Sequence, residues 1–76
     1  MPVNLTLQRS PARLTSRERE VLALVATGMS NKSVARQLQV SPNTIKFHIA
    51  AILDKLDAST RAEAVAAALR NGELSL

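Results

Sequence analysis

The sequence contains no cysteine, tryptophan or tyrosine, and only one phenylalanine and one histidine among its 76 residues. Without cysteine the chain can form neither a disulfide framework nor a thiolate metal site. A single histidine cannot build a zinc site alone, so we expect no metal and no cofactor. No apolar run approaches the roughly 20 residues that span a membrane, so we expect no membrane partner.

The patterns that enzymes need are also missing. The chain has only two glycines, and neither belongs to a glycine-rich phosphate loop. No nucleophile stands beside a base and an orienting group at a usable spacing. We therefore expect no catalytic residue and no enzymatic activity.

A chain this short forms one small domain, and a compact helical core is the economical way to bury its apolar residues. Ten lysines and arginines oppose six acidic residues, which gives a net charge of +4. Basic domains favour nucleic acids or acidic surfaces, with ordinary solubility as the alternative explanation.

Residues 1–13 contain two prolines and show no hydrophobic periodicity, which is typical of a flexible leader or an interdomain linker. They contain no apolar signal core, so we see no secretory targeting and expect a cytoplasmic protein. The folded domain is expected to cover residues 14–76.

Capping patterns and hydrophobic spacing predict four helices and no strand. The first helix begins at a capping box formed by Thr15 and Glu18, and Gly28 stops it. The second helix begins after its cap Ser30 and runs to about Leu38.

The third predicted helix runs from Pro42 to about Leu56, with Ser41 as its cap. Its core-facing side consists of Ile45, Ile49, Ile52 and Leu56. Its opposite side consists of Asn43, Lys46, Phe47, Ala50 and Asp54. The second and third helices, joined by a brief turn, predict a helix-turn-helix within a compact all-α domain of four helices.

The fourth predicted helix, about 60–71, begins at a second capping box formed by Thr60 and Glu63, and Gly72 ends it. Its inward side chains are expected to be Val65, Ala68 and Leu69. A second face of small side chains allows another helix to approach, which favours a dimer contact. The candidate contacts are Ala62, Ala66, Leu69 and Arg70. The alternative is that alanine is simply the best helix former.

A helix that reads DNA needs an apolar face to anchor it, small or polar residues opposite, and cations near the phosphates. The third helix meets these requirements. Lys46 can reach a guanine edge or a phosphate, and an exposed Phe47 can pack on the thymine methyl group. The alternatives are a solvated lysine and a phenylalanine folded against the domain. The base-reading candidates are Lys46, Phe47, Asn43 and Ala50.

Phosphate contacts are expected mainly at the starts of the second and third helices, where amides, hydroxyls and a lysine gather. The candidates are Ser30, Asn31, Lys32, Thr44, His48 and Lys55. Local capping is the alternative for Thr44, and a solvated side chain is the alternative for Lys55. For His48 a packed or hydrogen-bonded structural role is favoured over phosphate contact.

Five segments of the chain resemble the LuxR-type helix-turn-helix family, also known as the NarL/FixJ C-terminal domain. They are L-T-S-R-E-R-E-V-L from Leu14, G-M-S-N-K-S-V-A from Gly28, T-I-K-F-H from Thr44, I-L-D-K-L from Ile52 and R-A-E-A-V from Arg61. The match covers Leu14 to about Leu74 without a gap, so it is far more specific than a lone helix-turn-helix.

The resemblance implies a four-helix DNA-binding domain of a bacterial transcription regulator, whose third helix reads the major groove. It places Lys46 on the family's DNA-contacting lysine, and Phe47 and Ala50 on variable positions used for base readout. It also implies a homodimer on double-stranded promoter or operator DNA, formed through the fourth helix. RNA polymerase is a further candidate partner.

Members of this family usually carry the domain behind a phosphate-receiving or ligand-binding domain. The resemblance therefore favours the output domain of a two-component response regulator, with a stand-alone regulator as the alternative.

The chain departs from the family pattern at a few positions. Ala50 and Ala51 stand where members often carry polar or basic side chains. Asp54 is acidic where members are commonly basic or polar, and Ser33 replaces the usual glutamate. Fewer cations on the reading face predict a shallower salt dependence of DNA binding. The same changes leave open a second function, a protein-interaction module that keeps the fold without binding DNA.

Overall fold

The computed structural model describes residues 13–75, which form four helices and no strand. The helices are α2 (Ser16–Ala26), α3 (Asn31–Leu38), α4 (Pro42–Lys55) and α5 (Arg61–Asn71). The predicted all-α architecture is confirmed. Each described helix is too short or too polar to cross a membrane. The expected leader, apart from Arg13, lies outside the described residues.

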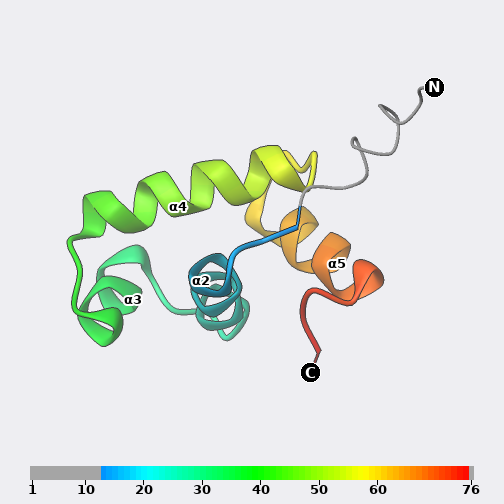
Figure 1. Cartoon of the computed structure of the whole chain (residues 1–76). Coiled ribbons are helices and arrows are strands. Elements are labelled where there is room, and N and C mark those ends of the chain that lie inside the picture. The colour runs from blue at the N-terminus through cyan, green and yellow to red at the C-terminus, as the bar shows by residue number, and fades with distance from the viewer. Residues whose placement is uncertain (1–12, 76) are drawn as a thin grey trace.

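Helices α2 and α4 form the centre of the domain, because each packs against all three other helices. Helices α3 and α5 lie near opposite ends of α4 (Figure 1), and within residues 13–75 they do not pack against each other. The shared core consists of Leu14, Val21, Leu22, Val25, Val34, Ala35, Ile45, Ile52, Ala64 and Ala68. Helix α4 therefore packs against α2, α3 and α5.

The sequence predicts capping boxes at α2 and α5, and the structure contains the first. The N–H of Glu18 donates to Thr15 Oγ1 at 3.0 Å, and the N–H of Thr15 donates to Glu18 Oε1 at 2.9 Å. At α5 the N–H of Glu63 donates to Thr60 Oγ1 at 3.1 Å. Glu63 Oε1, however, accepts from the N–H of Ser59 at 2.7 Å.

The prediction of a second capping box is therefore wrong in part: Thr60 caps the helix, but Glu63 does not accept a hydrogen bond from the N–H of Thr60. Thr60 has a more extended backbone (φ −137°) than Thr15 (φ −72°). A different N–H consequently faces the glutamate carboxylate, although the helix still begins where it was expected.

The two helices of the helix-turn-helix begin at the predicted serine caps. Ser30 Oγ accepts from the N–H of Ser33, and Ser41 Oγ accepts from the N–H of Thr44, both at 3.1 Å. Pro42 occupies the first turn of α4, where a missing N–H leaves no hydrogen bond unmade. These local bonds fix the first turns of both helices.

Left-handed backbone follows each of the four described helices, at Gly28, Gln39, Asp57 and Gly72. Gly28 and Gly72 have φ values of +96° and +78°, which glycine adopts because it has no Cβ to clash. Both predicted helix stops are confirmed. Gln39 ends α3 with φ +60°, an uncommon conformation for a residue with a side chain. The tight turn into α4 is thus made by a mildly strained residue.

Candidate nucleic-acid interface

Helix α4 is anchored by one face and exposes the other. Ile45 and Ile52 are 0% and 1% exposed, and burial of such side chains contributes about 2 kcal/mol each. Ile49 and Leu56 are half-buried against the same core. Phe47 is 71% exposed and is the one large apolar side chain exposed within residues 13–75. The predicted inner and outer faces are confirmed.

The four base-reading candidates lie together on the outer face of α4. Asn43, Lys46, Phe47 and Ala50 are all exposed, and their spacing of three and four residues places them on one side of the helix. Lys46 forms no ion pair with any of residues 13–75. The face therefore presents an amide, an ammonium group, an aromatic ring and a small side chain beside one another.

The first turn of α3 carries three of the phosphate candidates. Ser30 and Lys32 are exposed, and Lys32 has no ion-pair partner in the described part of the chain. Asn31 is half-buried, and its Oδ1 accepts a hydrogen bond from Arg61 Nη2. Nothing in the local sequence predicts this contact with Arg61, which lies 30 positions away.

The remaining phosphate candidates are half-buried, and two of them contact other side chains of the domain. Thr44 is half-buried, and its hydroxyl lies 3.0 Å from the hydroxyl of the cap Ser41. His48 is half-buried on a flank of α4. Lys55 is not the solvated side chain considered from the sequence, because its Nζ lies 2.8 Å from Glu18 Oε1 in an ion pair.

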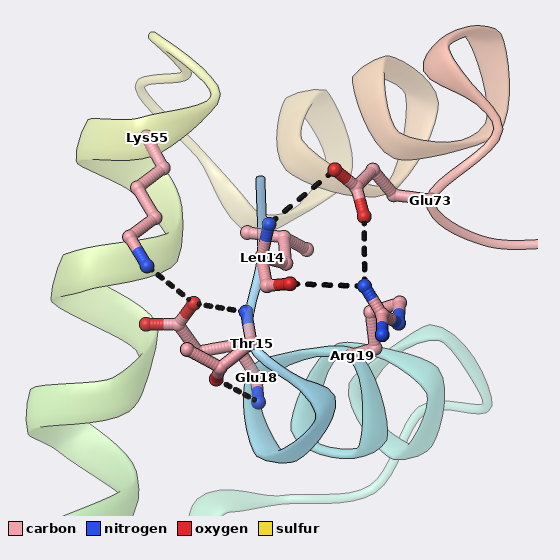
Figure 2. Close-up of polar contacts among 6 residues, drawn as sticks. All are labelled: Leu14, Thr15, Glu18, Arg19, Lys55 and Glu73. Atoms are coloured by element: carbon pink, nitrogen blue, oxygen red, sulfur yellow. Dashed lines mark hydrogen bonds and ion pairs between the residues drawn. The ribbon is translucent and has the colours of Figure 1, made fainter. Parts of the chain in front are cut away.

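Figure 2 shows that this ion pair belongs to a polar cluster that joins three parts of the domain. Glu18 connects α2 to Lys55 of α4. Arg19 donates from Nη1 to the carbonyl oxygen of Leu14 at 2.9 Å and to Glu73 Oε1 at 3.2 Å. Glu73 Oε2 accepts from the N–H of Leu14 at 3.3 Å. The cluster ties the residue that precedes α2 to α4 and to the segment after α5.

The neighbours of Glu18 favour the ionised form of its carboxyl group. Burial by itself would raise the pKa of the carboxyl group. Hydrogen bonds from Lys55 and Thr15, together with the positive charge of Lys55, outweigh burial, so the pKa of Glu18 lies below its ordinary value. The carboxylate is therefore ionised at neutral pH, and its ion pair with Lys55 connects α2 to α4.

Helix α5 exposes most of the dimer candidates. Ala62, Ala66 and Arg70 are exposed, and Leu69 is half-buried. Val65, predicted to face inward like Leu69, is also half-buried. Ala68 is buried as predicted, and Ala64 and Ala67 complete the buried side of the helix. The outer face of small side chains is present as predicted, while alanines form most of the inner contact.

These observations define a helix-turn-helix domain, in which α4 follows α3 after a tight turn and presents a free outer face. Residues 12–68 match the family described as bacterial regulatory proteins, luxR family. The chain belongs to this family, and it forms a LuxR-type helix-turn-helix DNA-binding domain of a transcription regulator, not an enzyme.

Individual relatives support the assignment. The nitrate/nitrite response regulator NarL of Escherichia coli K12 is 41% identical over 59 residues, which are 78% of this chain and 27% of NarL. The transcriptional regulatory protein LiaR of Bacillus subtilis 168 is 47% identical over 58 residues, which are 76% of this chain and 28% of LiaR. The chain thus spans about a quarter of the length of these relatives.

Solved structures show the same fold. The transcription factor GerE superposes with a TM-score of 0.78 at 42% identity, covering 82% of this chain and 92% of the GerE chain. The response regulator ChrA of a heme-sensing two-component system superposes with a TM-score of 0.79 at 32% identity. That match covers 93% of this chain and 37% of ChrA.

Proposed function

We propose that this domain binds double-stranded DNA sequence-specifically by placing the outer face of α4 in the major groove. The exposed face of α4 is the observation that carries the proposal. Lys46 and Phe47 project to solvent, while Ile45 and Ile52 lock the opposite face into the core. A helix held in this way delivers its outer side chains to base edges at fixed positions.

Each exposed side chain has a chemical role in this proposal. Lys46 donates to a guanine edge or a phosphate, and Phe47 packs on a thymine methyl group. Asn43 is placed to contact a base near the start of α4, and Ala50 leaves room for the groove to approach. Phosphates are contacted by the first turn of α3 and by the flanking side chains Thr44 and His48.

The outer face of α5 forms the homodimer contact in this proposal, with Ala62 and Ala66 at its centre. Both are exposed and small, so a second helix can approach closely. We further propose that the domain is the output part of a two-component response regulator, because NarL, LiaR and ChrA are regulators several times longer than the matched region. In this proposal the protein binds promoter DNA in the cytoplasm, and RNA polymerase is a candidate partner.

Fluorescence anisotropy with promoter duplexes over a salt series tests the proposed interface. Lys46→Ala should weaken binding by about 1–3 kcal/mol, because a charge-assisted contact in the groove is lost. Arg17→Ala is the control, since it removes the same charge from an exposed side chain of α2 that pairs with Glu20. Parent-like affinity of Lys46→Ala, or binding that ignores both salt and sequence, would contradict the proposal.

A further inference from the structure

We infer that Arg61 is a positioning residue of the DNA interface, which turns the Asn31 amide so that its NH2 group donates to a DNA phosphate. The inference rests on the function proposed above and adds a residue that the sequence did not assign to DNA binding. Its basis is the hydrogen bond from Arg61 Nη2 to Asn31 Oδ1.

This bond is not a by-product of helix packing. Asn31 is the first residue of α3 and Arg61 is the first residue of α5, 30 positions later. Within residues 13–75 these two helices do not pack against each other. The side chains alone therefore bridge the two helices, and the core does not require the contact.

The chemistry of the two groups fixes the orientation of the amide. A guanidinium group has only donors, so the Asn31 atom that faces it must be the carbonyl oxygen. The Asn31 NH2 group then points away from Arg61 within the amide plane, because the oxygen and the nitrogen are separate in-plane substituents of the amide carbon. A phosphate oxygen accepts hydrogen bonds, so it is attracted by this NH2 group and repelled by a carbonyl oxygen. Arg61 thus favours the amide orientation that leaves the Asn31 NH2 group, and not the carbonyl oxygen, available to a phosphate.

The neighbours of Asn31 favour the same ligand. Ser30 and Lys32, on either side of it, are exposed, and both were predicted to contact phosphate. Asn31 itself is only half-buried, so its NH2 group can meet a ligand from outside. Arg61 is exposed and places a positive charge beside the same turn. A group that accepts hydrogen bonds and carries negative charge is the ligand that suits this surface.

A double-mutant cycle in DNA affinity tests whether Arg61 acts through Asn31. Arg61→Ala and Asn31→Ala should each weaken binding about ten- to 150-fold, the range expected for loss of one hydrogen bond to a charged group. The double variant should be no weaker than either single variant. Arg61→Lys keeps a donor toward Oδ1 and should retain most of the affinity. Arg17→Ala serves as the control for lost charge.

Additive losses would overturn the inference, because Arg61 would then act on DNA by itself. Parent-like binding of Arg61→Ala, while Lys46→Ala is weakened, would overturn it and leave the proposed function intact. If Lys46→Ala also binds like the parent, the proposed interface fails and the inference fails with it.

A second readout reports on the amide directly and does not depend on affinity. In nitrogen-15 spectra of the parent, the side-chain NH2 signals of Asn31 should shift when DNA is added. In Arg61→Ala, at DNA concentrations that saturate the protein, these signals should move little, although the backbone signals of α4 still shift. The unperturbed backbone spectrum of the free variant checks its fold. Equal shifts of the NH2 signals in both proteins would contradict a positioning role.

Discussion

Two single side chains of this domain occupy environments that are unusual for their chemistry. Phe47 leaves an aromatic ring 71% exposed, whereas Glu18 buries a carboxylate at 6% exposure. The proposed DNA contact would account for the first, because the free energy of an apolar ring falls when a partner covers it. Local structure explains the second, because Thr15 and Lys55 supply hydrogen bonds and an opposite charge.

Phe47→Ala should change the base preference of the domain at a thymine. The variant loses an apolar contact with the C5 methyl group but loses little buried surface, so its stability should stay within about 0.5 kcal/mol of the parent. In vitro selection of bound duplexes measures the preference. DNA in which uracil replaces thymine is the matched control, because it lacks the same methyl group.

The parent should bind the uracil duplex more weakly than the thymine duplex, and Phe47→Ala should bind both alike. Identical selected sequences for parent and variant would show that the ring does not read the methyl group.

Glu18→Gln should lower the stability of the fold at neutral pH by about 1–3 kcal/mol, because Lys55 then loses the charged partner of its hydrogen bond. The folded pKa of Glu18 is lowered, so its stabilising effect is complete above the pKa that the carboxyl group has in the unfolded chain. The effect is lost as the pH falls through the folded pKa. Urea unfolding at a series of pH values should therefore show a flatter acid limb for the variant.

The control for that experiment is Glu20→Gln, an exposed glutamate of the same helix that pairs with Arg17 at 3.5 Å. An exposed pair of this kind contributes at most about 1 kcal/mol. If Glu18→Gln and the parent lose stability in parallel on acidification, the carboxylate does not have the stabilising role assigned to it.

At the scale of helices, the ends and the faces could be predicted because they depend on residues within one or two turns. Thr15, Ser30 and Ser41 cap their helices through bonds to residues three positions later. The exposure of Lys46 and Phe47 follows from helical periodicity alone. Most of the fold and the outer face of the candidate site were therefore visible in the sequence.

Contacts between helices could not be predicted in the same way. Lys55 meets Glu18 across 37 positions, and Arg61 meets Asn31 across 30. The packing of the helices decides which distant side chains come into contact. A local sequence pattern does not predict that packing. For this reason the sequence predicts a phosphate contact or a solvated side chain for Lys55, and no role for Arg61.

Helix α5 supplies the prediction for dimerisation. Ala66→Glu places a charged, longer side chain on its exposed face of small residues, so it should reduce cooperative binding to a duplex with two inverted half-sites. Binding to a single half-site should be unchanged. Sedimentation analysis of the complexes measures the stoichiometry. Ala23→Glu, at an exposed position of α2, is the control, and equal stoichiometry for both variants would exclude the α5 contact.

At the scale of the whole molecule, the domain carries two exposed surfaces on different helices. In the proposed function the outer face of α4 meets DNA and the outer face of α5 meets a second copy, while α2 packs against both helices. The polar cluster of Figure 2 adds a connection from Leu14 through α2 to the end of α4.

Nitrogen-15 chemical-shift mapping with a selected duplex tests the central claim most directly, because it shows which helix meets DNA. The largest shifts should fall on the outer face of α4, at Asn43, Lys46, Phe47 and Ala50, and on the first turn of α3. The Ala62 and Ala66 signals should shift only with a duplex that carries two half-sites. Shifts confined to α5 or α2, with α4 unperturbed, would contradict the claim that α4 reads DNA.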